Sequence, residues 1–206
     1  ASDVLEGLSS VAPTGGFCLI AADNERLLKM ERQAERHNTF ATNLSQYLQN
    51  CDALFDICII DTNPNPDIRQ LASLVVSDYV LSPIQLNQEA IDGIGELINH
   101  PTVGVARIKA TINPNLVLLG IIPNLVEPTP FQRANFKLLV EHYPELLISL
   151  GTSGFAAIKK STAVAEAQAA GIPVWESTKT SARTCWANMK PSFEQIAKNM
   201  AVEGND

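Results

Sequence analysis

The sequence predicts an α/β protein with a mostly parallel, doubly wound sheet and helices on both faces. Short apolar runs alternate along the chain with longer segments whose apolar residues recur at helical spacing. The run 116–122 is apolar along its whole length, which is typical of a parallel strand covered on both faces. Together these two observations favour the α/β class over an all-helical or all-β fold.

The predicted elements follow one another in strand–helix order. Strands are predicted at 17–22, 55–60, 79–84, 116–122 and, shorter, 145–149. Helices are predicted at 26–49, 67–76, 88–99, a stretch that ends at 113, 129–142, 162–170 and 182–200. No internal repeat or linker divides the chain. Residues 1–206 are therefore predicted to form a single domain.

Composition limits the classes of function. The 206 residues are 46% hydrophobic and 18% charged, which is typical of a folded globular protein. No apolar run approaches the roughly 20 residues that cross a bilayer, and no secretion signal is recognisable. The four cysteines have neither C-x-x-C spacing nor a nearby histidine, which indicates reduced structural thiols and not a zinc site. We therefore expect a cytoplasmic protein.

The charge of the chain is uneven. The net charge of −7 argues against nucleic acid as a partner of the whole surface. Between residues 159 and 190, however, the chain has five basic residues and only two acidic ones; the basic residues are Lys159, Lys160, Lys179, Arg183 and Lys190. Because salt screens charges beyond about 8–10 Å, a local basic patch can bind phosphate despite a negative total. The alternative interpretation is a solvated helix face.

Two polar residues are predicted where strands end, which is where open α/β sheets bind ligands. Asp61 directly follows the run 55–60, the position at which nucleotide-binding folds place a carboxylate near magnesium and the terminal phosphate. The alternative is that Asp61 caps the following turn or helix. Asn124 follows the run 116–122, and its amide suits the edge of a purine, although asparagine also forms turns. The sequence has no G-x-x-x-x-G-K-[ST] loop to hold the β- and γ-phosphates.

The order of several motifs resembles that of the ParA family of deviant Walker partition ATPases, and most closely the plasmid branch. The matching segments are Asp56–Pro64, Ser77–Ile84, Ile91–Gly93, Asn113–Asn115, Leu119–Asn124, Ala163–Ala167 and Gly171–Trp175. The resemblance extends from about Phe17 onward and implies a P-loop NTPase-like fold. In that family the phosphate loop, the next strand and an acidic residue that helps to activate water would precede Ala1. We therefore expect an N-terminally incomplete domain, which as written does not hydrolyse ATP.

The resemblance also implies roles for individual residues. Asp61 would be the Walker B aspartate that holds Mg²⁺ through water, and Thr62 would begin the catalytic switch that follows it. Asn124 would contact the adenine of ATP, helped by backbone around Pro173 and Val174. The five basic residues named above would bind DNA without sequence preference, by neutralising phosphates. Asn63 departs from the family, which has proline there, so the switch backbone is expected to be less restrained.

The leading hypothesis is a partition ATPase that segregates plasmids or chromosomes. In the complete protein, ATP would join two subunits into a dimer that binds DNA non-specifically and associates with the nucleoid. A ParB-type partner bound at the centromere would stimulate hydrolysis. One alternative is a relative without a phosphate loop that only binds or scaffolds. Another is a membrane-associated ATPase of the MinD class, but the end of the chain, 195–206, has one lysine and finishes acidic, which makes a poor membrane anchor.

Overall fold

The computed structural model describes residues 18–20, 23–63 and 65–201. The chain forms two compact units, and each is described by itself. Unit 1 takes its residues from 1–77 and 99–116, and unit 2 from 78–98 and 117–206. The single domain expected over 1–206 stays a prediction.

Unit 2 is built on a pair of parallel strands, β1 (Tyr79–Ile84) and β2 (Val117–Pro123). The register pairs Val80 with Leu118 and then Leu81 with Gly120, so Leu119 is an extra residue on β2. Such a bulge bends the bulged strand and increases its local twist.

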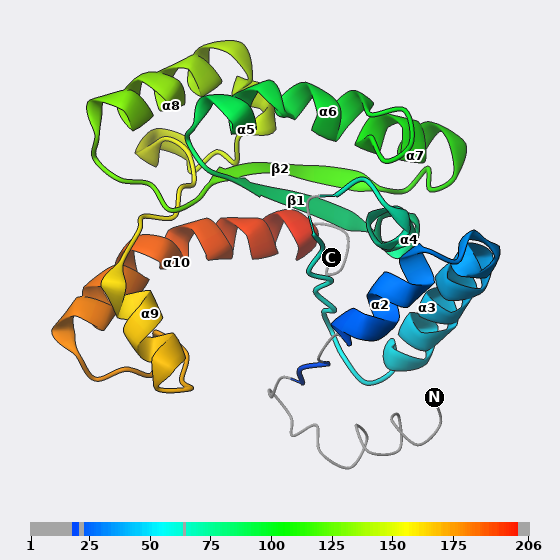
Figure 1. Ribbon diagram of the computed structural model, residues 1–206. Helices are drawn as coiled ribbons and strands as arrows, with labels where there is room; N and C mark the ends of the chain where they lie inside the picture. The colour runs from blue at the N-terminus through cyan, green and yellow to red at the C-terminus, as the bar shows by residue number, and fades with distance from the viewer. Residues whose placement is uncertain (1–17, 21–22, 64, 202–206) are drawn as a thin grey trace. The chain divides into compact units, whose positions relative to one another are not determined.

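Successive residues of β2 are buried in opposite layers. Ile121 packs with Leu86, Ile94 and Leu139 in one cluster, whereas Ile122 packs in another cluster that includes Ile196. The helices that cover the two faces are α5 (Gln88–Asp92), α6 (Ile94–Asn99) and α8 (Pro130–His142) on one side and α10 (Thr180–Ala201) on the other. Figure 1 shows this arrangement around the strand pair. The prediction of an α/β fold with a parallel sheet between helices is confirmed.

Three shorter elements complete unit 2: η2 (Pro144–Leu146), η3 (Gly151–Ser153) and α9 (Thr162–Ala169). α9 packs against the first half of α10 through buried apolar side chains, among them Ala163, Ala182 and Met189. The second half of α10 packs toward β2 through Ile196. Pro191 lies between the two halves, inside the helix. Because proline has no N–H, the carbonyl of the residue four positions earlier loses its helical hydrogen bond there.

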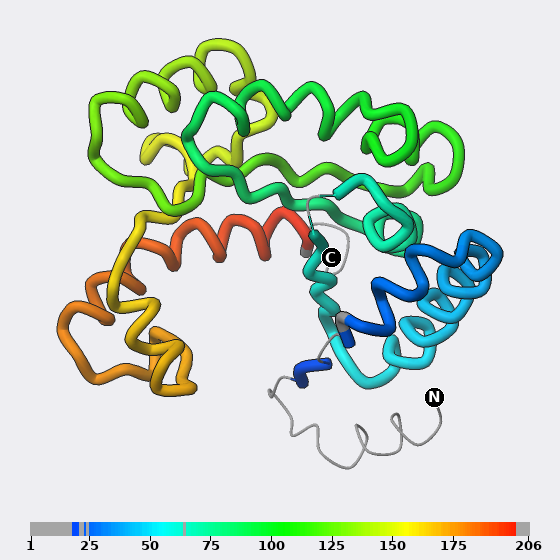
Figure 2. The backbone as a smooth tube through the Cα atoms, viewed as in Figure 1, coloured from blue at the N-terminus to red at the C-terminus, as the bar shows by residue number. Residues whose placement is uncertain are grey.

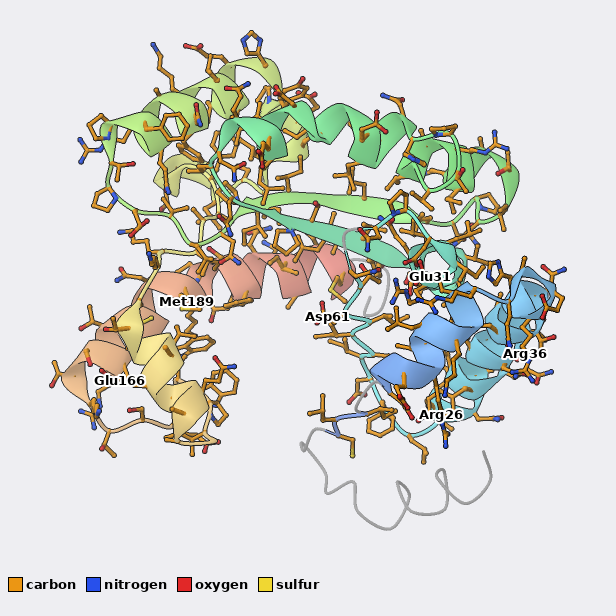
Figure 3. The ribbon with its side chains drawn as sticks, in the orientation of Figure 1. Arg26, Glu31, Arg36, Asp61, Glu166 and Met189 are labelled. Atoms are coloured by element: carbon orange, nitrogen blue, oxygen red, sulfur yellow. The ribbon has the colours of Figure 1, made fainter. Side chains whose placement is uncertain are left out.

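Unit 1 is helical in the part that the structure describes. Its elements are α2 (Asn24–Glu31), η1 (Ala34–Arg36), α3 (His37–Cys51), α4 (Ile68–Val76) and α7 (Val105–Thr111). α4 packs against both α3 and α7. The Asn113 amide donates hydrogen bonds to the carbonyls of Leu74 (3.1 Å) and Ser77 (2.8 Å), which pairs carbonyl groups that the end of α4 leaves open. The helix predicted at 26–49 is divided, and Figure 2 shows the chain turning between α2 and α3.

The predicted strands at 55–60 and 145–149 are wrong. Residues 55–60 form no strand, and Ile57 and Ile59 are 58% and 88% exposed. Residues 145–149 contain the end of η2 and only isolated bridges, from Leu147 to Ile121 and from Ser149 to Phe155. An apolar run becomes a strand only when a neighbouring backbone pairs with it, and composition does not supply that neighbour. Of the strand predicted at 17–22, only 18–20 are described, and they are not in a strand.

The described helices include none that is both long enough and apolar enough to cross a membrane.

Candidate functional site

Asp61 and Thr62 lie in unit 1, in an extended connection between α3 and α4. Both side chains are exposed. Asp61 does not cap the next helix. Asp67 has that role, because it is the N-cap of α4 and accepts a hydrogen bond from the Arg69 amide at 2.8 Å. Asp61 is therefore available to a ligand from solvent.

A polar network holds the far end of the segment that follows Asp61. The Asn63 amide donates to Asp67 Oδ2 at 3.3 Å, and Arg69 Nε donates to the same oxygen at 2.9 Å. The Arg69 guanidinium also forms an ion pair with Asp67 and another, at 3.2 Å, with Glu31 of α2. The segment expected to act as a switch is thus tied to the start of α4 and to α2.

This network shifts two pKa values. The Arg69 guanidinium beside Asp67 lowers the pKa of that carboxyl from 3.8 to about 2, helped by the Arg69 and Asn63 amide groups. Conversely, the hydrogen bond to Asp67 raises the pKa of Arg69. The two side chains are only 12% and 20% exposed, so water screens their interaction little.

We expect the stability of unit 1 to fall as the pH is lowered from about 4 to 2. In this window the unfolded chain binds a proton at Asp67 that the folded chain does not, so acid favours unfolding. The contribution is present above pH 4 and is of the order of 2 kcal/mol. Asp67→Asn should remove it and flatten the curve of unfolding free energy against pH, as measured by urea denaturation. The exposed Asp52→Asn is the control, and equal flattening in both variants would contradict the assignment.

The oxygen atoms near Asp61 fit one part of a magnesium site. Proteins commonly hold Mg²⁺ with one or two carboxylates, while water and substrate phosphates fill the other positions. Asp61 can supply such a carboxylate, and the Thr62 hydroxyl is next to it in the chain. In the described part of the chain no three His, Cys, Asp or Glu side chains gather closely enough to hold a metal by themselves.

Asn124 lies in unit 2, directly after β2. Its backbone N–H donates to the Ile84 carbonyl at 2.7 Å, which fixes it beside the end of β1. Its side-chain Oδ1 accepts from the Leu125 amide at 2.9 Å, and Leu125 has a positive φ of 53°. A leucine rarely adopts this conformation, and such strained backbone is concentrated at ligand sites. In the described structure the Asn124 side chain is bonded through Oδ1, so its amide nitrogen can still donate to a ligand.

The segment 158–160 runs beside Asn124. The Ile158 amide donates to the Pro123 carbonyl at 2.8 Å, and the Val126 amide donates to the Ile158 carbonyl at 3.0 Å. The Ile158 side chain packs against the cluster that contains Val174, which is 8% exposed. Ile158 thus links the segment 123–126, which contains Asn124, to the cluster that contains Val174. Because the Val174 side chain is in the core, a ligand contact at Val174 would have to use its backbone.

Lys159 and Lys160 line a pocket of about 380 Å³ in unit 2. Most of the surface that lines it is apolar, although several of its side chains have polar ends; the other lining residues are Ser161, Thr180, Ser181, Thr184, Cys185, Asn188 and Met189. The two lysines and the four hydroxyl groups among these residues are groups that can hydrogen-bond phosphate oxygens.

The other three predicted basic residues do not line this pocket. Lys179 pairs with Glu166 at 2.8 Å and Lys190 with Glu194 at 3.3 Å, while Arg183 is exposed on α10. Lys160 also pairs, with Glu127 at 3.0 Å. Exposed ion pairs are worth at most about 1 kcal/mol, so a phosphate can replace the carboxylate at little cost.

Several site residues were missed by sequence reasoning. The hydroxyl-rich start of α10, Thr180-Ser181-Ala182-Arg183-Thr184, was a recognisable signal for an anion-binding helix start. Asp67, an Asp two residues before an arginine at a predicted helix start, was a signal for a cap. The strain at Leu125 has no signal in the sequence, because leucine gives no hint of a positive φ.

Comparison with known proteins identifies relatives. Residues 11–118, just over half of the chain, match the AAA domain family. The chain is 32% identical to protein IncC of Escherichia coli over 149 residues, which are 72% of this chain and 38% of IncC. It thus spans well under half of the length of that relative.

Two solved structures share the fold. An ATP complex of an McdA variant from Cyanothece matches with a TM-score of 0.65 and 19% identity, over 98% of this chain and 76% of that one. Cobyrinic acid a,c-diamide synthase from Mycobacterium smegmatis, with an ATP analogue and magnesium, matches with a TM-score of 0.61 and 21% identity, over 98% of this chain and 74% of that one.

Proposed function

The chain belongs to the AAA domain family of ParA-type partition ATPases, and from this premise we propose that it acts in DNA segregation as an ATP-dependent, non-specific DNA-binding protein. ATP and Mg²⁺ would be its cofactors, and a homodimer that forms with ATP would be the DNA-binding state. A centromere-binding protein of the ParB type would be the partner that stimulates ATP hydrolysis.

The observation that carries this proposal is the backbone link between the segment 123–126, which contains Asn124, and the segment that carries the two lysines. Residues 123–126 share three hydrogen bonds with residues 158–160: Ile158 N–H to the Pro123 carbonyl, Val126 N–H to the Ile158 carbonyl and Lys160 N–H to the Val126 carbonyl. A ligand bound at Asn124 would therefore act on a segment that is hydrogen-bonded to the backbone of Lys160. This gives nucleotide binding a short path to the proposed DNA surface.

Each proposed residue has one role in this scheme. Asp61 would accept the water shell of Mg²⁺, and Thr62 would follow the state of the terminal phosphate. The Asn124 amide nitrogen would donate to adenine, while backbone around Pro173 and Val174 would complete the base site. Lys159 and Lys160 would bind phosphates of DNA in their pocket, and Lys179, Arg183 and Lys190 would extend the surface along α10.

We expect ATP to increase the affinity of the full-length protein for duplex DNA, compared with ADP or no nucleotide. Asn124→Ala should remove this dependence and leave the basal affinity within about twofold, because it takes away the adenine contact and no charge. Fluorescence anisotropy with a labelled duplex measures both quantities. The exposed Asn115→Ala is the matched control.

Equal DNA affinity with and without ATP in the parent protein would contradict the switch and indicate a binding module without nucleotide control. DNA binding that depends on ATP in Asn124→Ala as strongly as in the parent would instead move the adenine contact elsewhere.

A further inference from the structure

Three aromatic rings of unit 2 form a continuous strip. The ring centroids of Trp175 and Trp186 are 5.1 Å apart, and those of Trp186 and Phe193 are 6.1 Å apart with an interplanar angle of 23°. Trp186 is the middle ring and packs against the cluster between α9 and α10. The two outer rings are open to solvent, with Trp175 58% and Phe193 42% exposed.

The strip is more than the scattered exposure that is normal for single apolar residues. The two outer rings stay partly exposed although Trp186 already packs against the core, so core packing does not explain why they are there. The planes of Trp175 and Trp186 are inclined at 48°, so the strip is not flat, but each outer ring offers an exposed apolar surface.

Cations alternate with the rings along one face of α10. Arg183, Trp186, Lys190 and Phe193 follow one another at spacings of three and four residues, which places them on the same side of a helix. Residues 159–198 contain six basic and three acidic side chains, although the whole chain has a net charge of −7. The charge of this region is therefore complementary to a polyanion.

We propose that the Trp175–Trp186–Phe193 strip binds single-stranded nucleic acid by stacking on its bases, while Arg183 and Lys190 bind its phosphates. Single strands offer flat bases and a phosphate chain together, and proteins bind them through aromatic rings beside a basic groove. A duplex keeps its base faces inside the stack, so the rings have no contact to make with it. This inference rests on the proposed function, because Arg183 and Lys190 belong to the proposed DNA surface.

The chain carries its own optical probe for this site. Its two tryptophans, Trp175 and Trp186, are both in the strip. Titration of the full-length protein with an oligothymidylate of about 15 nucleotides should quench tryptophan fluorescence, whereas a duplex of the same length should bind with little quenching.

Truncation of the outer rings separates the two kinds of binding. Trp175→Ala/Phe193→Ala should weaken oligothymidylate binding by roughly tenfold or more and leave duplex affinity within about twofold. Trp175→Phe should retain most of the binding, because it keeps a ring. Phe131→Ala is the matched control, since Phe131 is 58% exposed on α8. Both truncated positions are exposed, and circular dichroism verifies that the variants are folded.

The outcomes distinguish this inference from the proposed function. Duplex binding that persists while oligothymidylate affinity is the same in parent and double variant overturns only the strip. An equal loss of both kinds of binding overturns it as well. A change in oligomeric state with unchanged oligothymidylate affinity would assign the strip to a second copy of the chain and overturn the stacking. Absence of any DNA binding by the parent would refute the proposed function itself.

Discussion

Gly120→Ala is expected to destabilise unit 2 by about 3–5 kcal/mol. Gly120 has φ of 141°, which L side chains rarely adopt, and an added Cβ would lie 2.6 Å from the backbone carbonyl oxygen of Leu146 and 3.1 Å from Ile148 Cγ1. Strained φ and forced overpacking each cost roughly 1–3 kcal/mol. The clash is with backbone, so no side chain can rotate away to relieve it.

Urea denaturation of the parent and the variant measures this loss. Gly171→Ala is a matched control, because Gly171 also has a positive φ, 67°, but a Cβ there would meet nothing within 4 Å. It should cost only about 1 kcal/mol. If the two variants lose the same stability, the close approach of β2 to η2 does not constrain the fold.

Lys159→Gln/Lys160→Gln is expected to weaken duplex binding by about 60-fold at a salt concentration of about 0.1 M. Each lysine that neutralises a phosphate contributes about 0.9 to the slope of log affinity against log salt. Removal of two such contacts should lower that slope by about 1.8. The slope is a sharper readout than affinity alone, because a misfolded variant would lose binding without this defined change.

The control for this prediction keeps the change in net charge and moves it to unit 1. Arg107→Gln/Lys109→Gln neutralises two exposed cations on α7, and the salt slope should stay at the parental value. A parental slope in the Lys159/Lys160 variant would move the DNA site away from the pocket.

The fold of unit 2 was largely predictable from the sequence. The run 79–84 and the run 116–122 are β1 and β2 within one residue, because each has a parallel neighbour and helices on both faces. The helix predicted at 129–142 is α8, whose first residue, Pro130, is well suited to a first helical turn. In these segments local propensity and tertiary packing agree.

The errors concentrate where the decisive partner is remote in sequence. Residues 55–60 have the composition of a buried strand, yet Ile59 is exposed and no strand pairs with it in the described structure. The break between α2 and α3 was missed as well, because the residues there, Arg32 and Gln33, are neither glycine nor proline and give no turn signal. Apolar composition reports what a segment can bury, and pairing decides whether it does.

The sequence indicated which positions of the chain to consider for the candidate site, but not the contacts that these residues make. The sequence pointed to Asn124 and the Lys159–Lys160 pair separately, and in the structure the segments that contain them, 123–126 and 158–160, are hydrogen-bonded to each other. Glu127, the partner of Lys160, lies 33 residues away, and Glu166, the partner of Lys179, lies 13 residues away, so no local pattern could have revealed them. The side chain of Val174 packs in the core, and the adenine contact expected from backbone around Pro173 and Val174 stays a prediction.

Pro191 gives α10 a mechanical property that a continuous helix would not have. The carbonyl of Ala187 has no amide to accept from, so the rod bends there more easily than elsewhere. The first half of α10 contains Arg183 and packs on α9, and the second half packs on the sheet through Ile196. A bend at Pro191 would let the first half of α10 move with α9 while the second half stays packed on β2 through Ile196.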